Sequence, residues 1–308
     1  MIYELEVNRL KTLDELLHKI DQKNLKVVAV AQAADKEVLR AVKHALQLNI
    51  GHFLLVGDQP EIKSLAEQIE LDLSQQGVRL KHSEAGLAAE EAVKAVRNGE
   101  AHVVMKGQID TKQLLKAVLN KQFGLRTNRV LSHVALFEVP NQDRLIFLTD
   151  AAMNITPTLD EKVHIINNAV EVAVKAGWKM PKVTPLAAVE VVNSSMPATQ
   201  DAALLTQMNR RGQIKHCIVD GPLAFDNAVD RQAADQKGIT SEVAGEADIL
   251  VVPTIEVANA LYKSFMYFAG AKVAAVISGA KAPIVLTSRA DSAQSKVYSL
   301  ALALQTSK

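Results

Sequence analysis

The segment A-P-I-V-L-T-S-R-A-D-S, from Ala282 to Ser292, holds the densest set of chemically useful side chains in this sequence. Ser288, Arg289 and Asp291 follow a short apolar run, and a helical pattern starts at Ala293. A hydroxyl, a guanidinium, a carboxylate and the free N–H groups of a helix start together suit a phosphate or an oxyanion. Serine and aspartate before a helix are also ordinary N-caps, so a structural interpretation stays open.

A second polar cluster follows another apolar run, in V-V-M-K-G-Q-I-D-T from Val103 to Thr111. Lys106 and Gly107 come directly after the run. Asp110 and Thr111 come directly before a helical pattern. Lysine supplies a point charge for an anion, and glycine lets a ligand approach the backbone closely. A capped helix beside a solvated lysine explains the same residues, so both interpretations stay open.

Further loops end apolar runs with polar side chains that could line a ligand site. In L-T-D-A-A-M-N, Asp150 and Asn154 follow such a run, at a position where side chains can face a cleft. Two later loops are explained equally well by turn and capping chemistry, and we expect Thr199 to cap a helix after the first of them. The secondary candidates in these loops are Asn193, Ser194, Ser195, Asp220 and Asp226.

Several familiar kinds of site are disfavoured by the sequence. The single cysteine, Cys217, excludes an internal disulfide framework and a cysteine-rich metal site, and its apolar neighbours in H-C-I-V favour a buried thiol. The eight histidines lack H-x-x-x-H spacing, so we expect no metal. There is no G-x-x-x-x-G-K-[ST], and no G-x-G-x-x-G after the first apolar run, which argues against Walker-type and ordinary dinucleotide sites.

Charge and hydropathy limit the expected partners. The 35 basic and 34 acidic side chains leave a formal net charge of +1, so no global field would attract nucleic acid or an anionic membrane. The start M-I-Y-E-L-E-V lacks the basic and apolar regions of a secretory signal. Charged residues or proline interrupt the apolar stretches well short of the roughly 20 residues that span a bilayer. We therefore expect a cytoplasmic protein without a membrane or nucleic-acid partner.

Short runs rich in Val, Ile and Leu alternate with amphipathic stretches, which predicts an α/β fold with repeated β-α units around parallel sheets. The rhythm changes between residues 128 and 149, where two runs separated by P-N-Q-D-R predict an antiparallel hairpin. The strands expected in this half are Val27–Ala31, Phe53–Val56, Val78–Leu80, His102–Met105, Val134–Phe137 and Leu145–Leu148.

The β-α rhythm resumes with a helix expected over Leu159–Ala176 and closed by Gly177 as its C-cap. With 308 residues and 48% hydrophobic content, the chain is long enough to form two cores. The strands expected in this half are Pro185–Val191, His216–Val219, Ile249–Val252, Val273–Ile277 and Ile284–Leu286.

Several motifs, in their joint order along nearly the whole chain, resemble the phosphate acetyl/butyryltransferase family. These motifs are K-G-Q-I-D-T, T-D-A-A-M-N, D-G-P-L-A-F-D, E-V-A-G-E-A-D-I-L-V-V-P, E-V-A-N-A-L-Y-K and S-G-A-K-A-P-I-V-L-T-S-R-A-D-S. The short chain, its I-S-G-A-K-A-P-I-V-L-T-S-R-A-D-S segment and G-L-R-T from Gly124 to Thr127 are closer to the phosphate butyryltransferase branch than to the longer acetyltransferases.

The resemblance implies two doubly wound α/β domains with largely parallel sheets and an active-site cleft between them. Domain I would comprise residues 1–130 and 278–308, and domain II residues 131–277, in a homodimer or higher homo-oligomer. The implied reaction is reversible transfer of a short-chain acyl group, butyryl or similar, between coenzyme A and inorganic phosphate through a ternary complex. The partners would be acyl-CoA, inorganic phosphate and acyl phosphate, with no cofactor because coenzyme A is a substrate.

The resemblance also implies roles for individual residues. The family's Ser-Arg pair matches Ser288 and Arg289, which would bind phosphate and polarise the acyl carbonyl. The acetyltransferases place an aspartate base where this chain has Ser295, so we expect the nearest carboxylate, Asp291, to be the base. The expected substrate-binding residues are Lys106, Gly107, Asp110, Thr111, Asp150, Asn154 and Lys281, and none is expected to bind a metal.

Three other functions stay open. A phosphate acetyltransferase is the nearest alternative, because the sequence does not specify the length of the acyl chain. A metal-dependent oxidoreductase of related α/β architecture would need clustered carboxylates or histidines. A non-catalytic coenzyme A binding protein would retain the pocket without the chemistry.

Overall fold

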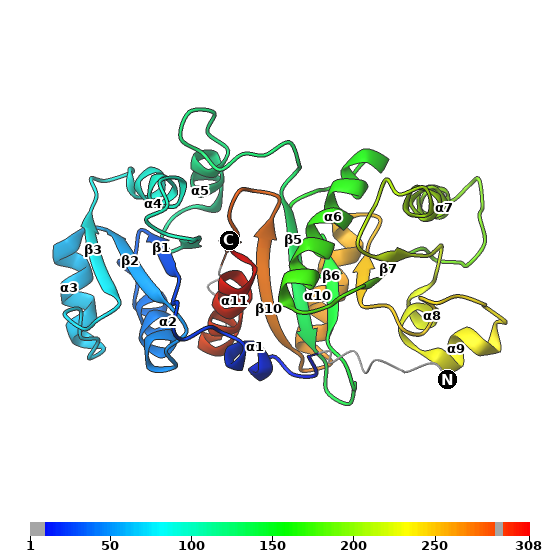
Figure 1. Cartoon of the computed structure of the whole chain (residues 1–308), viewed down its shortest axis with the longest axis horizontal. Coiled ribbons are helices and arrows are strands. Elements are labelled where there is room, and N and C mark those ends of the chain that lie inside the picture. Colours follow the sequence, from blue (N-terminus) through cyan, green and yellow to red (C-terminus); the bar gives the residue numbers. More distant parts are fainter. Residues whose placement is uncertain (1–9, 287–291) are drawn as a thin grey trace. The chain divides into compact units, whose positions relative to one another are not determined.

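The computed structural model of the chain describes residues 10–286 and 292–308. The chain forms two compact units of strands and helices (Figure 1). The N-terminal unit comprises Asp14–Arg129 and Ala274–Lys308, and the central unit comprises Met1–Leu13, described from residue 10, and Val130–Val273. The predicted α/β class is confirmed, and the domain limits expected from the sequence stay a prediction.

Six strands of the N-terminal unit lie in the order β3-β2-β1-β4-β11-β10. All neighbours are parallel except β10 and β11, which pair antiparallel through Ile277 and Ile284. The elements are α1 (Asp14–His18), β1 (Val27–Ala31), α2 (Lys36–Gln47), β2 (His52–Gly57), α3 (Gln59–Gln68), β3 (Val78–His82), α4 (Ala88–Arg97), β4 (Val103–Lys106), α5 (Thr111–Val118), β10 (Lys272–Ser278), β11 (Ile284–Val285) and α11 (Ala293–Thr306).

Strands β1, β2 and β4 are mostly apolar because helices cover both faces of the sheet, whereas the edge strand β3 alternates apolar and basic residues. Strand β1, of sequence VVAVA, is buried from its second residue to its end. Helix α4 packs on β1 and β2, whereas α11 packs on α1 and α2. Figure 1 shows α4 and α5 on one side of the strands and α2, α3 and α11 on the other. The start of α11 is thus held beside the start of the first β-α unit.

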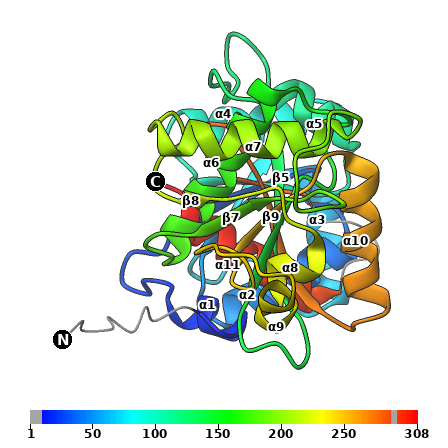
Figure 2. The same ribbon diagram turned by 90° about the vertical axis from the view of Figure 1, so that its right-hand side faces the viewer.

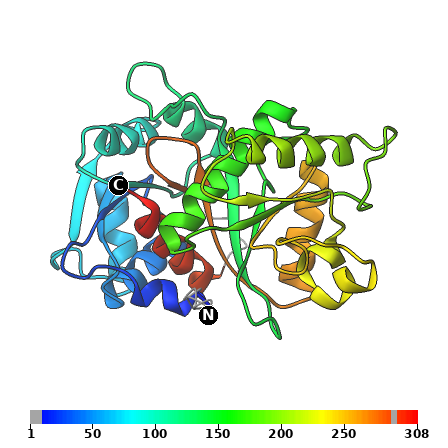
Figure 3. The ribbon, with the colours of Figure 1, turned by 45° about the vertical axis from the view of Figure 1, so that its right-hand side comes forward.

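Five strands of the central unit lie in the order β5-β6-β9-β7-β8. Strands β5 and β6 form the predicted antiparallel hairpin, green in Figure 3, and the remaining neighbours are parallel. The elements are β5 (Ser132–Glu138), β6 (Ile146–Thr149), α6 (Leu159–Ala176), β7 (Lys182–Pro185), α7 (Pro197–Arg210), β8 (Ile218–Val219), α8 (Phe225–Val229), α9 (Arg231–Gln236), β9 (Ile249–Val251) and α10 (Ile255–Tyr267).

Helix α6 begins and ends where the sequence predicts. Thr158 and Glu161 form a capping box at its start, and Gly177, with φ of 117°, ends it in the left-handed conformation that favours glycine. The helix packs on β5, β6 and β9. Figure 2 shows α6 and α7 together on one side of the strands, with α8 and α9 on the other.

Two local predictions in the central unit are wrong. The strand expected over Pro185–Val191 is β7, which ends at Pro185, apart from an isolated bridge between Leu186 and Leu223. Its neighbours β8 and β9 end at Val219 and Val251, so the apolar residues beyond have no adjacent strand with which to pair. The other expected strands lie within about two residues of the observed ends.

The second error concerns the start of α7. Thr199, expected as its N-cap, lies inside the helix, which begins at Pro197 after Met196. The Thr199 hydroxyl is buried and instead receives the backbone N–H of Asn193 at 2.9 Å, which fixes the preceding loop. Proline fits the first helical position because that position needs no N–H donor, and this outweighs the capping preference of threonine.

In the part of the chain that the structure describes, no helix combines the length and the apolar character needed to cross a bilayer.

Candidate active site

The strand order of the N-terminal unit creates a place where a ligand crevice is expected. From β1 the chain passes to β2 on one side, and it returns to β4 on the other side only after β3. At such a topological switch point, the loops after the two neighbouring strands diverge and leave a crevice at the carboxyl edge of the sheet. The two loops here are those that follow β1 and β4.

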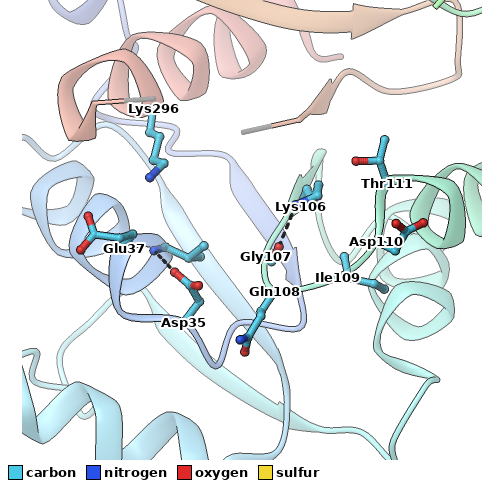
Figure 4. Close-up of a pocket in the computed structure, with 10 residues that line it drawn as sticks. Asp35, Glu37, Lys106, Gly107, Gln108, Ile109, Asp110, Thr111 and Lys296 are labelled. Carbon is cyan, nitrogen blue, oxygen red and sulfur yellow. Dashed lines mark hydrogen bonds between the residues drawn. The ribbon is translucent and has the colours of Figure 1, made fainter. Parts of the chain in front are cut away.

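A pocket of about 520 Å³ lies at this edge (Figure 4). It is lined by the loop after β1 and the start of α2, by the loop after β4 and the start of α5, and by one residue of α11. The lining residues are Asp35, Glu37, Val38, Lys106, Gly107, Gln108, Ile109, Asp110, Thr111 and Lys296. The pocket therefore brings together four of the expected substrate-binding residues, Lys106, Gly107, Asp110 and Thr111.

Gly107 lies where the two loops touch. Its N–H donates to the carbonyl of Ala31 at 2.9 Å, and the next N–H, of Gln108, donates to the carbonyl of Gln32 at 2.7 Å. A Cβ atom at position 107 would lie 2.0 Å from the carbonyl oxygen of Gln32. The glycine thus allows close approach of the β1 loop, where the sequence suggested close approach of a ligand.

The pocket carboxylates already have partners within the protein. Asp35 accepts the N–H of Val38 at 2.9 Å and caps α2. Asp110 accepts the N–H groups of Lys112 and Gln113, at 2.8 and 3.3 Å, and caps α5. Glu37 pairs with Arg40 one turn along α2. The capping interpretation of Asp110 is therefore correct, and its carboxylate stabilises the helix start.

Positive charge reaches the pocket from two directions. Lys106, the last residue of β4, is half-buried, and its ammonium donates to the carbonyl of Gly107 at 3.3 Å. Lys296, in the first turn of α11, is only 3% exposed and extends toward the same space in Figure 4. The two lysines lie on elements separated by most of the chain length.

Sequence reasoning did not select Lys296. A signal was available, because Lys296 immediately precedes V-Y-S-L-A-L-A-L, a run that is apolar on nearly every face. Such a run predicts a helix buried all round, and a lysine at its start must then be buried or face a cavity. The apolar run is indeed buried, from Val297 to Leu304.

Asp150 and Asn154 belong to the central unit and form a closed turn after β6. Asp150 is buried, with 4% of the residue exposed. It accepts backbone N–H groups from four residues and the side-chain amide of Asn154, which also donates to the carbonyl of Leu131 at 2.8 Å. The four backbone donors are His133, Ala152, Met153 and Asn154, at 3.0–3.2 Å. The polar groups of this turn are used largely on one another.

The expected catalytic residues Ser288, Arg289 and Asp291 lie outside the described residues. The strand before them, β11, is parallel to β4, with Val285 opposite Met105. After them, Ser292 caps α11 by accepting the N–H of Ser295 at 3.0 Å. Lys281 is exposed, and its backbone N–H donates to the carbonyl of Leu125 at 2.8 Å.

The remaining candidates lie in the central unit. The Cys217 thiol is buried, and burial raises its pKa to about 12, so it is the inert core thiol that the sequence predicts. Asn193 accepts the N–H of Ser195 in a tight turn, and Asp226 pairs with Lys237 at 3.6 Å. Across residues 10–286 and 292–308, His, Cys, Asp and Glu side chains form no cluster suited to a metal ion.

The comparison with known protein families decides the kinship of the chain. The family described as Phosphate acetyl/butaryl transferase matches residues 12–91 and 81–304. The chain belongs to this family. The resemblance inferred from the sequence motifs is thereby confirmed, and the matched region includes every pocket residue as well as Ser288, Arg289 and Asp291.

Individual members of the transferase family match almost end to end. A "Probable phosphate butyryltransferase" of Bacillus subtilis is 55% identical, covering 96% of this chain and 98% of that protein. A phosphate butyryltransferase of Clostridium beijerinckii is 50% identical, covering 95% and 97%. The solved structure of a branched-chain phosphotransacylase from Enterococcus faecalis matches with a TM-score of 0.79 and 36% identity, covering 92% of this chain and 99% of that one.

Proposed function

We propose that this enzyme transfers a short-chain acyl group, butyryl or similar, between coenzyme A and inorganic phosphate. The reaction is acyl-CoA and phosphate giving acyl phosphate and coenzyme A, through a ternary complex. The observation that carries the proposal is the near full-length match to phosphate butyryltransferases at 50% identity and above. The pocket at the switch point of the N-terminal unit supports it, because that position binds ligands in open α/β sheets.

The chemistry requires binding and charge stabilisation. A phosphate oxygen forms a bond to the acyl carbon while the carbon–sulfur bond breaks, and the electron pair of that bond leaves on the coenzyme A sulfur. In reverse, the thiolate attacks the acyl carbon, and phosphate leaves with the carbon–oxygen electron pair. Negative charge gathers on the acyl oxygen in both directions, so positive groups and N–H donors can accelerate the reaction. No cofactor is part of this proposal.

We assign the reacting centre to Ser288, Arg289 and Asp291. Arg289 and Ser288 would hold the phosphate and polarise the acyl carbonyl, and Asp291 would take the proton of the attacking thiol. A free thiol has a pKa of about 8.5, so a carboxylate aided by local positive charge is a sufficient base. The flanking residues support this assignment, because β11 runs parallel to β4 and so ends at the same edge of the sheet as the pocket.

The proposal also covers the domain limits, the oligomeric state and the cellular location of the enzyme. Domain I would comprise residues 1–130 and 278–308 and domain II residues 131–277, and Asp150, Asn154 and Lys281 would be further substrate-binding residues. We also propose a cytoplasmic homodimer. The apolar surface at the end of α10 supports an oligomer, since Tyr267 is 74% and Phe268 91% exposed.

The test is incubation of the purified enzyme with butyryl-CoA and phosphate while thiol release is followed. Phosphate-dependent thiol release is expected, with acetyl-CoA and branched acyl-CoA as comparison substrates. Faster turnover of acetyl-CoA would favour the alternative, a phosphate acetyltransferase. Loss of activity with a chelator would favour a metal-dependent oxidoreductase of related fold, and coenzyme A binding without turnover would favour a non-catalytic binding protein.

Substitution of Arg289 tests the reacting centre. For Arg289→Ala we expect kcat to fall by about a hundredfold to a thousandfold, the usual cost of losing a group that stabilises developing negative charge. Arg79→Ala is the matched control, because Arg79 is an exposed residue of β3 outside the pocket lining. Near-normal activity of Arg289→Ala would overturn the role of Arg289 and leave the overall reaction in place.

A further inference from the structure

Lys296 is a buried lysine without a partner among the described residues. The residue as a whole is 3% exposed, its ammonium opens on the pocket, and across residues 10–286 and 292–308 no hydrogen bond or ion pair of that ammonium is found. The pocket carboxylates are engaged elsewhere, since Asp35 and Asp110 cap helices and Glu37 pairs with Arg40. Transfer of a lysine from water into the protein costs free energy unless a counter-charge compensates it. The position of Lys296 therefore calls for an anion from outside.

The ammonium of Lys296 has access to such an anion. Its side chain leaves the first turn of α11 and points into the pocket toward the start of α2, where Asp35 and Glu37 lie, and the loop that begins at Lys106 lies on the other side (Figure 4). The three pocket carboxylates accept N–H groups or pair with Arg40, which offsets part of their charge. A negatively charged ligand in the pocket is attracted by the ammonium groups of Lys106 and Lys296, which line it from two sides.

We infer that Lys296 binds a phosphate group of a substrate in this pocket, together with Lys106. The inference rests on the proposed function, in which two substrates carry phosphate, namely inorganic phosphate or acyl phosphate and coenzyme A. Lysine binds phosphate as a point charge and so does not demand a fixed orientation of the oxygens. Lys296 is a substrate-binding residue in this assignment, and the kinetic test identifies which phosphate it holds.

The test compares Lys296→Met with Lys296→Arg and with Lys36→Met. Methionine keeps the length of the side chain and removes the charge, whereas arginine keeps the charge. Lys36 is an exposed residue at the first position of α2 and does not line the pocket, so its replacement controls for a change in net charge. Initial rates are measured with phosphate and butyryl-CoA varied independently.

For Lys296→Met we expect the KM of one phosphate-bearing substrate to rise by about tenfold or more, as for loss of one charge-assisted contact. A rise in the KM of phosphate alone assigns inorganic phosphate to Lys296, and a rise in the KM of butyryl-CoA alone assigns a coenzyme A phosphate. Lys296→Arg should recover most of the loss. Both KM values within about twofold of those of Lys36→Met would overturn the inference.

A binding measurement separates this inference from the proposed reaction. Without ligand, Lys296→Met should unfold at a temperature equal to or above that of the unaltered enzyme, because the change removes a largely buried charge that has no partner among the described residues. Inorganic phosphate or coenzyme A should then raise the Tm of the unaltered enzyme more than that of Lys296→Met.

The two failures have different signatures. Ligand stabilisation that depends on Lys296 in a protein without acyl transfer would defeat the proposed function and support the phosphate site. Acyl transfer with equal ligand stabilisation of both proteins would defeat the role of Lys296 alone. A Lys296→Met protein that unfolds at a markedly lower Tm without ligand would also overturn the inference, since it would reveal a structural partner for the ammonium.

Discussion

The loop after β4 and the turn after β6 have similar sequences but different surroundings in the structure. Each follows a buried strand with an acidic residue and an amide or a basic residue within a few positions. After β6, the Asp150 carboxylate is enclosed by four backbone N–H groups and the amide of Asn154. After β4, the polar residues border a pocket of about 520 Å³. Internal donors enclose the Asp150 carboxylate, whereas Lys106 and Asp110, which also have partners within the protein, border the pocket.

This difference shows which of the two sets of polar side chains is accessible to a ligand. A carboxylate that already accepts several N–H groups has little capacity left for a substrate, whereas side chains that border a pocket can still reach one. Access to the pocket therefore distinguishes the two regions better than residue type does. Predictions that follow concern stability on the β6 side and activity on the β4 side.

The largest effect on stability is expected for Asp150→Ala. Removal of this buried acceptor leaves several donors without their partner and should lower the free energy of unfolding by about 3 kcal/mol. Urea unfolding monitored by circular dichroism measures the loss. Lys106→Met, on the other side of the comparison, should change stability by less than about 0.5 kcal/mol while reducing acyl transfer. An Asp150→Ala protein of normal stability but little activity would instead place Asp150 at a substrate.

Gly107→Ala should have the next largest effect. The added Cβ would lie 2.0 Å from the carbonyl oxygen of Gln32, and backbone cannot yield as a flexible side chain does. We expect the free energy of unfolding to fall by about 2 kcal/mol. Activity should also fall, because the loops after β1 and β4 must move apart to make room for the methyl group. Gly99→Ala is the comparison variant, because no atom lies within 4 Å of its added Cβ. Its φ of 80° adds some backbone strain, so any loss it shows comes from backbone conformation and not from a steric clash. Full activity and stability of Gly107→Ala would contradict this packing argument.

Asp110→Ala should lower the free energy of unfolding by about 1 kcal/mol, because α5 loses its N-cap. Asp110→Asn, which retains a capping oxygen, should recover most of the stability. If both variants are equally stable but differ in the KM of a phosphate-bearing substrate, the carboxylate acts mainly through its charge in the pocket. Chemical unfolding and initial rates on the same two proteins provide the measurements.

The smallest effect is expected at Cys217. Burial raises the pKa of its thiol to about 12, so the reactive thiolate is scarce at neutral pH and rises only in strongly alkaline solution. Iodoacetamide should label the native enzyme slowly and the urea-unfolded enzyme rapidly, and Cys217→Ala should retain acyl transfer. Rapid labelling of the native enzyme at neutral pH, with loss of activity, would show that the thiol is exposed or functional.

The helices and strands could be predicted where the local sequence pattern determines them. Continuous apolar runs located β1, β2 and β4, and the helical pattern over Leu159–Ala176 followed by Gly177 located α6. The error at Pro185–Val191 arises from long-range pairing, which local pattern does not reveal. Strand β7 ends where its hydrogen-bonded neighbours β8 and β9 end. Thr199 was misplaced for a related reason, since a proline two residues earlier competes for the helix start.

Sequence order and residue type were enough to establish the α/β class, the hairpin, the long helix and the kinship with the phosphate acetyl/butyryl transferases, because these depend on neighbouring residues and on motif order. Only the folded chain distinguished the closed turn of Asp150 from the open pocket of Lys106, and only the folded chain placed Lys296 opposite that lysine. These features depend on contacts between segments far apart in the chain, such as those of Asp35 and Lys296, and no local periodicity encodes which long-range partners a polar side chain will find.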